Sequence, residues 1–294
     1  MTDYDPQKDA HDSYYAAIEA KRGRGDAVIR REVQIGDCRL ILGDCLEVLP
    51  LLEREARFAR AIALSKAAGE PWAGSGSNRR CEWIRKAMAI PVFDAVVTDP
   101  PYGIGESAAK NNRRGLLAKP KDYGSDDWDQ APADPKVIAW MRENSDWQII
   151  FGGNYFDLPP TSCWLVWDKK VNGDFADCEL AWTNLKKAVR RIEWMWNGML
   201  RKGNEERFHL TQKPLGVMEW CLGHLPASVG IVCDPYAGSG TTGVACVKRG
   251  LQFIGIERET HHFETMVKRI SAATEAPDMF IEPRAPEPKQ EALL

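Results

Sequence analysis

Two prolines beside an acid form the first stretch of the chain that could do chemistry. The stretch is T-D-P-P-Y-G at residues 98–103, directly behind an apolar run. Proline has no backbone N–H, and a residue that precedes proline is held extended. Asp99 and the Pro100 carbonyl are therefore rigid acceptors, Pro100 and Pro101 bring no competing donor, and Tyr102 adds a planar ring. The pattern predicts a stiff, acceptor-rich corner at the end of a buried strand.

A glycine-rich turn is the second such stretch. V-C-D-P-Y-A-G-S-G-T-T-G, residues 232–243, follows a predicted strand and opens a predicted helix. A turn in that position presents backbone N–H groups to a ligand. Gly238, Gly240 and Gly243 satisfy G-x-G-x-x-G, and Glu257 ends the next predicted strand, where an acid can bind ribose hydroxyls. A nicotinamide-dependent oxidoreductase is therefore one hypothesis.

Asp234, just before the turn, favours a different ligand. Facing a pyrophosphate, this carboxylate would make a like-charge contact that costs on the order of several kcal/mol. A ligand with a sulfonium and an amino-acid ammonium would instead be stabilised by it, and S-adenosylmethionine carries both beside a ribose and an adenine. No Gly-Lys-Ser/Thr follows the turn, so a P-loop is excluded. A turn that only packs a helix on a strand remains the third interpretation.

We call residues 98–103 and residues 232–243 the two corners. The elements that position them alternate between strand and helix. Apolar runs predict strands at 38–42, 93–98, 147–151, 164–169, 230–234 and 253–257. Helices are predicted at 46–52, 136–144, 214–225, 241–249 and 259–274. Residues 190–196 alternate apolar and polar, which predicts a half-exposed antiparallel strand. The order indicates an α/β fold, Rossmann-like, with a mostly parallel sheet and helices on both faces.

Composition is typical of a globular protein of the cytoplasm. The chain has 294 residues, 44% hydrophobic and 28% charged, with no apolar run long enough to span a membrane and no signal-peptide pattern at its start. Its eight cysteines form no C-x-x-C pair, which favours buried thiols in a reducing compartment. The five histidines have no ligand spacing, so no metal is expected.

Charge and composition also divide the chain. Although the net charge is −3, residues 183–213 hold eight Lys/Arg against three Glu, and residues 53–91 hold eight against four. Two such blocks could present a positive face to a polyanion. We predict an N-terminal arm (1–30), one domain (31–274) with an insertion (53–91), and an acidic, Pro-rich tail (275–294). The long polar stretch at 106–134 is expected to be a functional loop.

The two corners together resemble the DNA amino-methyltransferases, which methylate an exocyclic base nitrogen with S-adenosylmethionine. D-P-P-Y comes first, then a basic segment, then Q-K-P at 212–214, then D-P-Y-A-G-S-G-T-T and G-I-E. This permuted order resembles the β class of the N6-adenine and N4-cytosine DNA methylases. The resemblance covers about 33–52 and 92–274, leaving out the arm, the insertion and the tail.

The resemblance implies a role for each matching residue. The catalytic residues would be Asp99, Pro100, Pro101 and Tyr102. The cofactor would be bound by Asp44, Cys45, Lys213, Pro214, Asp234, Ala237, Gly238, Ser239, Gly240, Thr241, Thr242 and Glu257. W-D-K (167–169) and D-C-E-L-A-W (177–182) resemble motifs that wall the target-base pocket, residues 183–210 stand where a short target-recognition region belongs, and 211–274 form the cofactor-binding half. DNA would be contacted by Lys169, Lys186, Lys187, Arg190, Arg191, Arg201 and Lys202.

The implied chemistry fits the acceptor corner. An exocyclic amine is a weak nucleophile because its lone pair is spread into the ring. Acceptors on its two hydrogens, here Asp99 and the Pro100 carbonyl, would localise the lone pair and aim it at the methyl group. Tyr102 would stack on a base flipped out of double-stranded DNA. Within the family, D-P-P-Y goes mostly with adenine N6 and S-P-P-Y mostly with cytosine N4.

The sequence therefore predicts an adenine-N6 DNA methyltransferase. The alternatives are an N4-cytosine enzyme, the oxidoreductase, and a DNA-binding relative without activity. The sequence specifies neither the recognition sequence nor whether a partner nuclease exists. A homodimer is possible because family members often pair.

Overall fold

The computed structural model describes residues 28–70, 72, 77–105, 131–170, 176–197, 200–201 and 212–276. The predicted arm up to residue 27, most of the polar stretch (106–130) and the predicted tail from 277 on lie outside the described residues. β1 begins at Ile29, just before the predicted start of the domain at residue 31.

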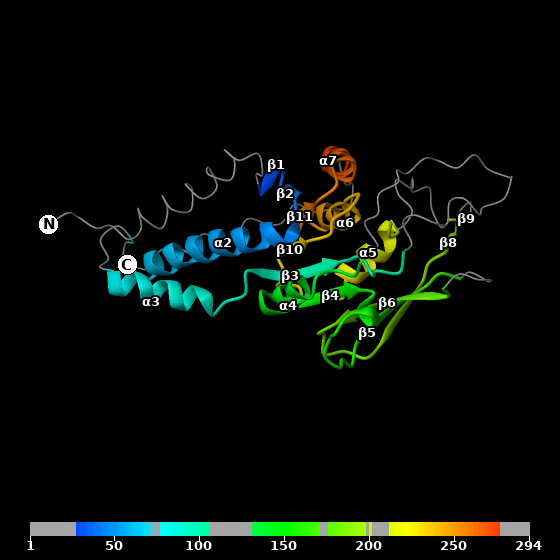
Figure 1. The fold of residues 1–294 in the computed structure, drawn as a ribbon, viewed down its shortest axis with the longest axis horizontal. Coiled ribbons are helices and arrows are strands. Elements are labelled where there is room, and N and C mark those ends of the chain that lie inside the picture. The colour runs from blue at the N-terminus through cyan, green and yellow to red at the C-terminus, as the bar shows by residue number, and fades with distance from the viewer. Residues whose placement is uncertain are drawn as a thin grey trace, which may run out of the picture.

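One sheet of nine strands forms the centre of the fold (Figure 1). Its strands are β1 (Ile29–Ile35), β2 (Cys38–Gly43), β3 (Phe93–Thr98), β4 (Ser145–Phe151), β5 (Trp164–Asp168), β6 (Cys178–Thr183), β7 (Arg190–Glu193), β10 (Ile231–Asp234) and β11 (Gln252–Glu257). Their order in space is β1-β2-β11-β10-β3-β4-β6-β5-β7. From β2 to β4 every neighbouring pair is parallel, which confirms the predicted mostly parallel sheet. A separate ribbon pairs β8 (Trp196–Asn197) with β9 (Leu200–Arg201).

Helices cover both faces of this sheet, as the continuous apolar runs of its central strands predict. In β3, Ala95 and Val97 belong to one hydrophobic core, while Phe93 and Val96 belong to the other. The first core also contains residues of α5 (Leu215–Leu222), α6 (Thr241–Lys248) and α7 (Thr260–Glu275). The second contains residues of α2 (Cys45–Ala67) and α4 (Pro135–Glu143).

The winding of the chain leaves a crevice between β3 and β10. After β3 the chain passes through α4 to β4 on one side, and after β10 it passes through α6 to β11 on the other. The two neighbouring strands therefore diverge at their carboxyl ends. Such a topological switch point is where open α/β sheets bind ligands, and both corners singled out in the sequence lie there.

The prediction of an antiparallel strand at 190–196 was wrong in its pairing. β7 lies half-exposed at the sheet edge, as its alternation predicts, but it pairs parallel with β5. The reason is the position of β6, which lies between β4 and β5 and is antiparallel to both. β7 runs opposite to β6, and so does β5. Because β7 lies beside β5 in the sheet, these two strands are parallel.

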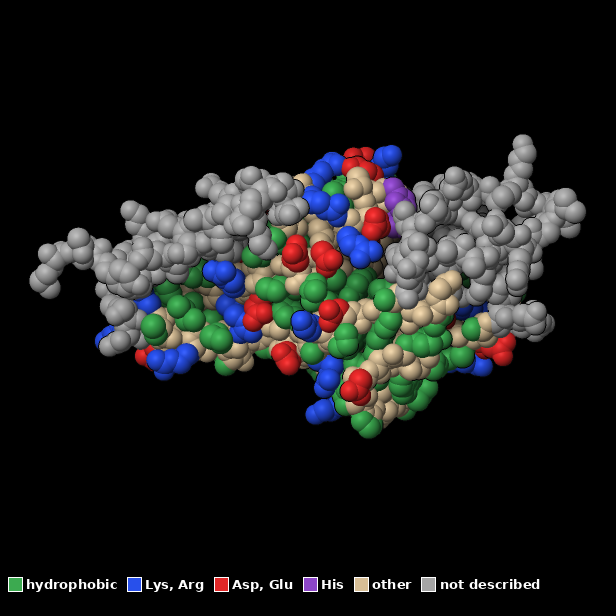
Figure 2. Space-filling model, in the orientation of Figure 1, with side chains coloured by type: hydrophobic (Ala, Val, Ile, Leu, Met, Phe, Trp, Pro, Cys, Tyr) green, Lys and Arg blue, Asp and Glu red, His purple; other side chains and the backbone are tan. Residues whose placement is uncertain are grey.

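The predicted short helix at 46–52 is also longer than expected. α2 runs for 23 residues from Cys45, through Pro50 and into the predicted insertion. Burial of Ala61 and Ser65 keeps the helix continuous beyond the proline. α2 packs against α3 (Ser77–Met88), and this pair projects from the sheet, away from the carboxyl end of β3 (Figure 1). On the face seen in Figure 2, Lys and Arg side chains are interspersed with Asp and Glu.

Candidate active site

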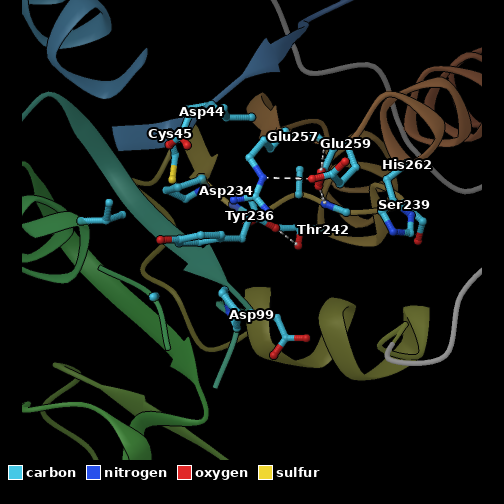
Figure 3. Close-up of a pocket in the computed structure, with 18 of the residues that line it drawn as sticks. Asp44, Cys45, Asp99, Asp234, Tyr236, Ser239, Thr242, Glu257, Glu259 and His262 are labelled. Carbon is cyan, nitrogen blue, oxygen red and sulfur yellow. Dashed lines mark hydrogen bonds and ion pairs between the residues drawn. The ribbon is translucent and has the colours of Figure 1, made fainter. Parts of the chain in front are cut away.

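A pocket of about 460 Å³ opens at the switch point, at the carboxyl ends of β3, β10 and β11 (Figure 3). The structure brings most of the predicted site residues to its wall. These are Asp44, Cys45, Asp99, Pro101, Lys213, Asp234, Ala237, Gly238, Ser239, Thr241, Thr242 and Glu257. Four others, Pro100, Tyr102, Pro214 and Gly240, lie next to lining residues in the chain without lining this pocket themselves.

The glycine turn is held against α7 by contacts that the sequence did not predict. Gly240 has φ +81°, and a Cβ at this position would lie 2.7 Å from the Met266 side chain, so glycine is required by both conformation and space. Arg269 of α7 donates to the Ser239 carbonyl at 2.8 Å and to the Thr241 hydroxyl at 3.0 Å. Arg269 does not line the pocket, so its guanidinium fixes the turn to α7 from outside.

Asp234 is the buried acid of the turn, 2% exposed. Its carboxylate accepts hydrogen bonds from the hydroxyls of Thr98 and Thr242, both at 2.6 Å, and from the Tyr236 N–H at 3.1 Å. Burial raises its pKa to about 6, although these hydrogen bonds oppose the rise. The bond from Thr98 joins the end of β10 to the end of β3, so the two corners form one structure.

Glu257 closes the other side of the turn. It accepts from the Gly238 N–H at 2.8 Å and from the Glu259 N–H at 2.7 Å. Burial raises its pKa to about 7, against the effect of these N–H donors. Further along the wall, Asp44 caps α2 by accepting from the Leu46 N–H at 2.9 Å. Figure 3 shows Asp44 and Cys45 on one side of the pocket and Asp99 on the other.

Asp99 lies in a row of charged side chains. The Tyr102 hydroxyl donates to Asp99 Oδ1 at 2.5 Å, and the Lys213 ammonium forms an ion pair with Oδ2. Lys213 also lies 3.0 Å from Glu179 Oε2, and Lys169 lies 2.6 Å from Glu179 Oε1. Burial raises the pKa of Asp99 above its ordinary value, although Lys213 opposes the rise.

The two lysines of this row differ from their predicted surroundings. Lys213, predicted to border the cofactor, lines the pocket but places its ammonium on Asp99. Lys169, predicted to contact DNA, is directed inward to Glu179. Burial alone would lower the pKa of Lys213, but the carboxylates of Asp99 and Glu179 raise it, so the ammonium stays charged. Glu179 falls in the quoted D-C-E-L-A-W stretch, yet no local pattern distinguishes it as the partner of both lysines.

Tyr102 has an aromatic neighbour that the sequence did not single out. Tyr155 stacks on it with ring centroids 5.1 Å apart and planes inclined by 17°. Tyr155 belongs to a short 3₁₀ turn, η3 (Gly153–Tyr155), and is 49% exposed. A Cβ on Gly152 would lie 2.0 Å from the Tyr102 ring, so this glycine lets the ring approach the backbone. One face of Tyr102 is thus covered by the half-exposed ring of Tyr155.

The predicted DNA contacts are only partly described. Lys186 and Lys187 are exposed on the segment before β7, and Arg190 and Arg191 are exposed in β7 itself. Lys187 donates to the His224 carbonyl at 2.7 Å, and Arg191 pairs with Glu193 at 2.7 Å. The side chain of Arg201 and all of Lys202 lie outside the described residues. Their roles stay predictions.

The described part of the chain lacks two features. It contains no group of three or more His, Cys, Asp or Glu side chains that could hold a metal ion. None of its helices combines the length and the apolar composition needed to cross a membrane.

The fold and the pocket define a Rossmann-like α/β protein with an acidic switch-point site, and part of the chain is similar to a known family. Residues 164–268 match the family model described as DNA methylase, of the N6/N4 class. This part of the chain is therefore similar to the DNA methylases of that family. The matched region includes Lys169, Glu179, Lys213 and the glycine turn, whereas Asp99 lies before it.

Curated relatives are type II methyltransferases. M2.MboI of Moraxella bovis is 28% identical over 153 residues, which are 47% of this chain and 50% of that protein. M2.DpnII of Streptococcus pneumoniae is 34% identical over 88 residues, 29% of this chain and 33% of that protein. The chain thus spans half the length or less of these relatives. A crystal structure of an M1.HpyAVI–SAM complex matches 79% of this chain and 99% of its own, with 21% identity and a TM-score of 0.43.

Proposed function

We propose that this protein is an S-adenosylmethionine-dependent DNA methyltransferase that acts on the exocyclic N6 of adenine. The observation that carries the proposal is the pairing of the two corners. The acceptor corner at Asp99 and the acidic glycine turn at Asp234 open into one pocket and are joined by the 2.6 Å hydrogen bond from Thr98 to Asp234. A methyl donor on one side and an amine on the other would therefore meet between them.

The residues of the turn fit S-adenosylmethionine. Asp234 and Glu257 are surrounded by hydroxyl and backbone N–H donors, and burial raises the pKa of each, to about 6 and about 7. A ligand that brings an ammonium to Asp234 and ribose hydroxyls to Glu257 would stabilise the ionised carboxylates. Asp44 and Cys45 would border its adenine. When bound, S-adenosylmethionine supplies the electrophilic methyl group.

Asp99 would act on the amine. Its carboxylate and the Pro100 carbonyl would accept the two amine hydrogens, which localises the nitrogen lone pair toward the pocket. Methyl transfer leaves a positive charge on the amine nitrogen, and one proton must then be lost. Asp99 is placed to stabilise that charge, and because burial raises its pKa it is also a suitable first acceptor for the proton.

Adenine rather than cytosine is favoured by the acid that opens D-P-P-Y. The test incubates duplex DNA with the protein and S-adenosylmethionine, then identifies the methylated nucleoside by mass spectrometry. N6-methyladenine is the expected product; N4-methylcytosine would correct the base, and no methylated base would overturn the proposal. Calorimetry with S-adenosylmethionine and with NAD tests the ligand, and tight binding of NAD alone would favour an oxidoreductase.

The Asp99→Ala variant tests the catalytic corner. We expect methylation to fall by about 10²- to 10⁴-fold, while binding of S-adenosylmethionine is retained. Asp146→Ala is the matched control because Asp146 is exposed at the start of β4, at the opposite end of the strands from the pocket. Full activity of Asp99→Ala would remove this corner from the mechanism.

A further inference from the structure

The row of charges beside Asp99 has more members than neutralising one carboxylate requires. It alternates in sign through Lys169, Glu179, Lys213 and Asp99. Lys213 is 7% exposed and touches both carboxylates. A single ion pair would neutralise Asp99, so the second pair, Lys169 with Glu179, calls for another explanation. Through Glu179, this second pair gives Lys213 an ion-pair partner other than Asp99.

Lys213 lies beside the position that the proposed function gives to the target base. Its ammonium is 5.8 Å from the centre of the Tyr102 ring, on which a flipped base is proposed to stack, and Lys213 also lines the pocket. An ammonium has three N–H donors, and two carboxylates at Lys213 leave one for a further acceptor. A carboxylate has about four lone-pair sites. Asp99 can therefore accept an amine hydrogen without losing Tyr102 or Lys213.

Asp99 and Lys213 thus present an acceptor immediately beside a donor. The edge of adenine that carries its amine has the complementary pattern, because the amine donates and the ring nitrogen next to it accepts. We propose that Lys213 donates a hydrogen bond to the ring nitrogen adjacent to the target amine, and that Glu179 is the positioning residue that holds Lys213 there. This inference rests on the proposed function and assigns the contacts of the base in that same site.

Glu179 acts through Lys213 rather than on the base. Its two oxygens bind two different ammonium groups, at 2.6 Å and 3.0 Å, so it fixes Lys213 from the side away from Asp99. Without that charge, Lys213 would be drawn wholly to Asp99 and would occupy the lone pairs needed for the amine. Loss of Glu179 is therefore expected to lower kcat on DNA while binding of S-adenosylmethionine is unchanged.

The decisive experiment changes the base rather than the protein. Duplexes carry adenine, 7-deazaadenine or 1-deazaadenine at the methylated position, and kcat/KM is measured for each with the unaltered protein. A hydrogen bond to a charged donor is worth about a ten- to hundredfold difference. We expect a loss of that size with one of the two analogues, which identifies the nitrogen. Equal rates with all three bases would overturn the proposal.

A double-mutant cycle then assigns the contact to Lys213. In Lys213→Met the loss caused by the sensitive analogue is expected to disappear, whereas Lys213→Arg, which keeps a charged donor, is expected to retain part of it. Lys86→Met is the matched control, because Lys86 pairs with Glu82 at 2.9 Å on α3 and both are exposed. An analogue effect that persists undiminished in Lys213→Met would exclude Lys213 as the donor.

Glu179→Gln and Glu179→Asp separate positioning from structure. Glu179→Gln is expected to lower kcat about tenfold or more and to shift the pH dependence of kcat, with recovery in Glu179→Asp. Glu82→Gln, in the exposed pair on α3, is the control. Unchanged kcat in Glu179→Gln would overturn its positioning role. If ordinary DNA is not methylated at all, the proposed function itself fails, and that outcome is distinct from equal rates on the three bases.

Discussion

Asp99 and Asp234 both stand at the carboxyl ends of buried neighbouring strands, yet their partners differ. Asp234 is surrounded by two hydroxyls and one backbone N–H, with no ammonium or guanidinium in the contacts described for it. Asp99 has the Lys213 ammonium and a phenol. A buried carboxylate without a cation is stabilised by a cationic ligand, whereas one that already has its cation is suited to a neutral donor. The pair of acids therefore distinguishes a charged methyl donor from a neutral amine.

The largest expected effect comes from neutralising each acid in turn. Asp99→Asn keeps the shape of the corner but weakens its acceptor, and we expect kcat to fall by about 10²- to 10⁴-fold with the Kd for S-adenosylmethionine unchanged. Asp234→Asn is expected to weaken that Kd by about ten- to a hundredfold, with a smaller change in kcat at saturating ligand. Calorimetry and single-turnover kinetics measure the two. The same loss of affinity in both variants would contradict the division of roles.

A smaller effect is expected from pH, and it concerns only the cofactor side. The pKa of Asp234 is raised to about 6 and that of Glu257 to about 7, both by burial. A cationic ligand favours the ionised acids, so the affinity for S-adenosylmethionine should rise as pH increases from 5.5 to 8. The slope is at most about tenfold per pH unit for each acid, and Asp234→Asn should make it shallower.

Stability of the free protein should run the other way. In the folded state both acids bind protons more tightly than in the unfolded state, where their pKa values are near 4. Their contribution to the free energy of unfolding is therefore fully present below about pH 4 and is lost as pH rises through 6 to 7. Urea unfolding at several pH values, with and without S-adenosylmethionine, measures both trends. An affinity that does not change with pH would show that these acids do not meet the ligand's charge.

Much of the fold could be predicted because the central strands are buried on both faces. Their unbroken apolar runs indicate strand and length together, and the run at 93–98 coincides with β3. The pairing of β7 could not be predicted, because it depends on where β6 lies in the sheet. The length of α2 was underestimated because an insertion was predicted to begin at residue 53, whereas the burial of Ala61 and Ser65, which extends the helix past that residue, comes from tertiary packing.

The positions of the acidic residues of the candidate site could be predicted from the sequence, whereas the ion-pair partners of its lysines could not. Asp99 directly follows β3, while Asp234 and Glu257 end β10 and β11, and the carboxyl ends of parallel strands meet at one edge of a sheet. The contact between Lys213 and Asp99 joins residues 114 positions apart, and the one between Lys213 and Glu179 depends on β6 lying beside β4. A side-chain ion pair between distant segments leaves no periodic pattern in the sequence. Lys213 and Lys169 could be recognised as basic residues of motifs, but their partners could not.

The smallest effect concerns Tyr155, which stacks on Tyr102, the tyrosine that donates to Asp99. Stacked aromatic pairs contribute about 0.5–1.5 kcal/mol beyond the area they bury, and Tyr155 is half-exposed. Tyr155→Ala should lower the free energy of unfolding by about that amount and change KM for DNA several-fold, because a flipped base and Tyr155 would use the same ring of Tyr102. Tyr155→Phe keeps the ring and should behave like the unaltered protein. Affinity for S-adenosylmethionine should be equal in all three, since neither tyrosine lines its pocket. If Tyr155→Ala weakened that affinity as much as Asp234→Asn does, the two corners would not be the separate binding sites that their different partners indicate.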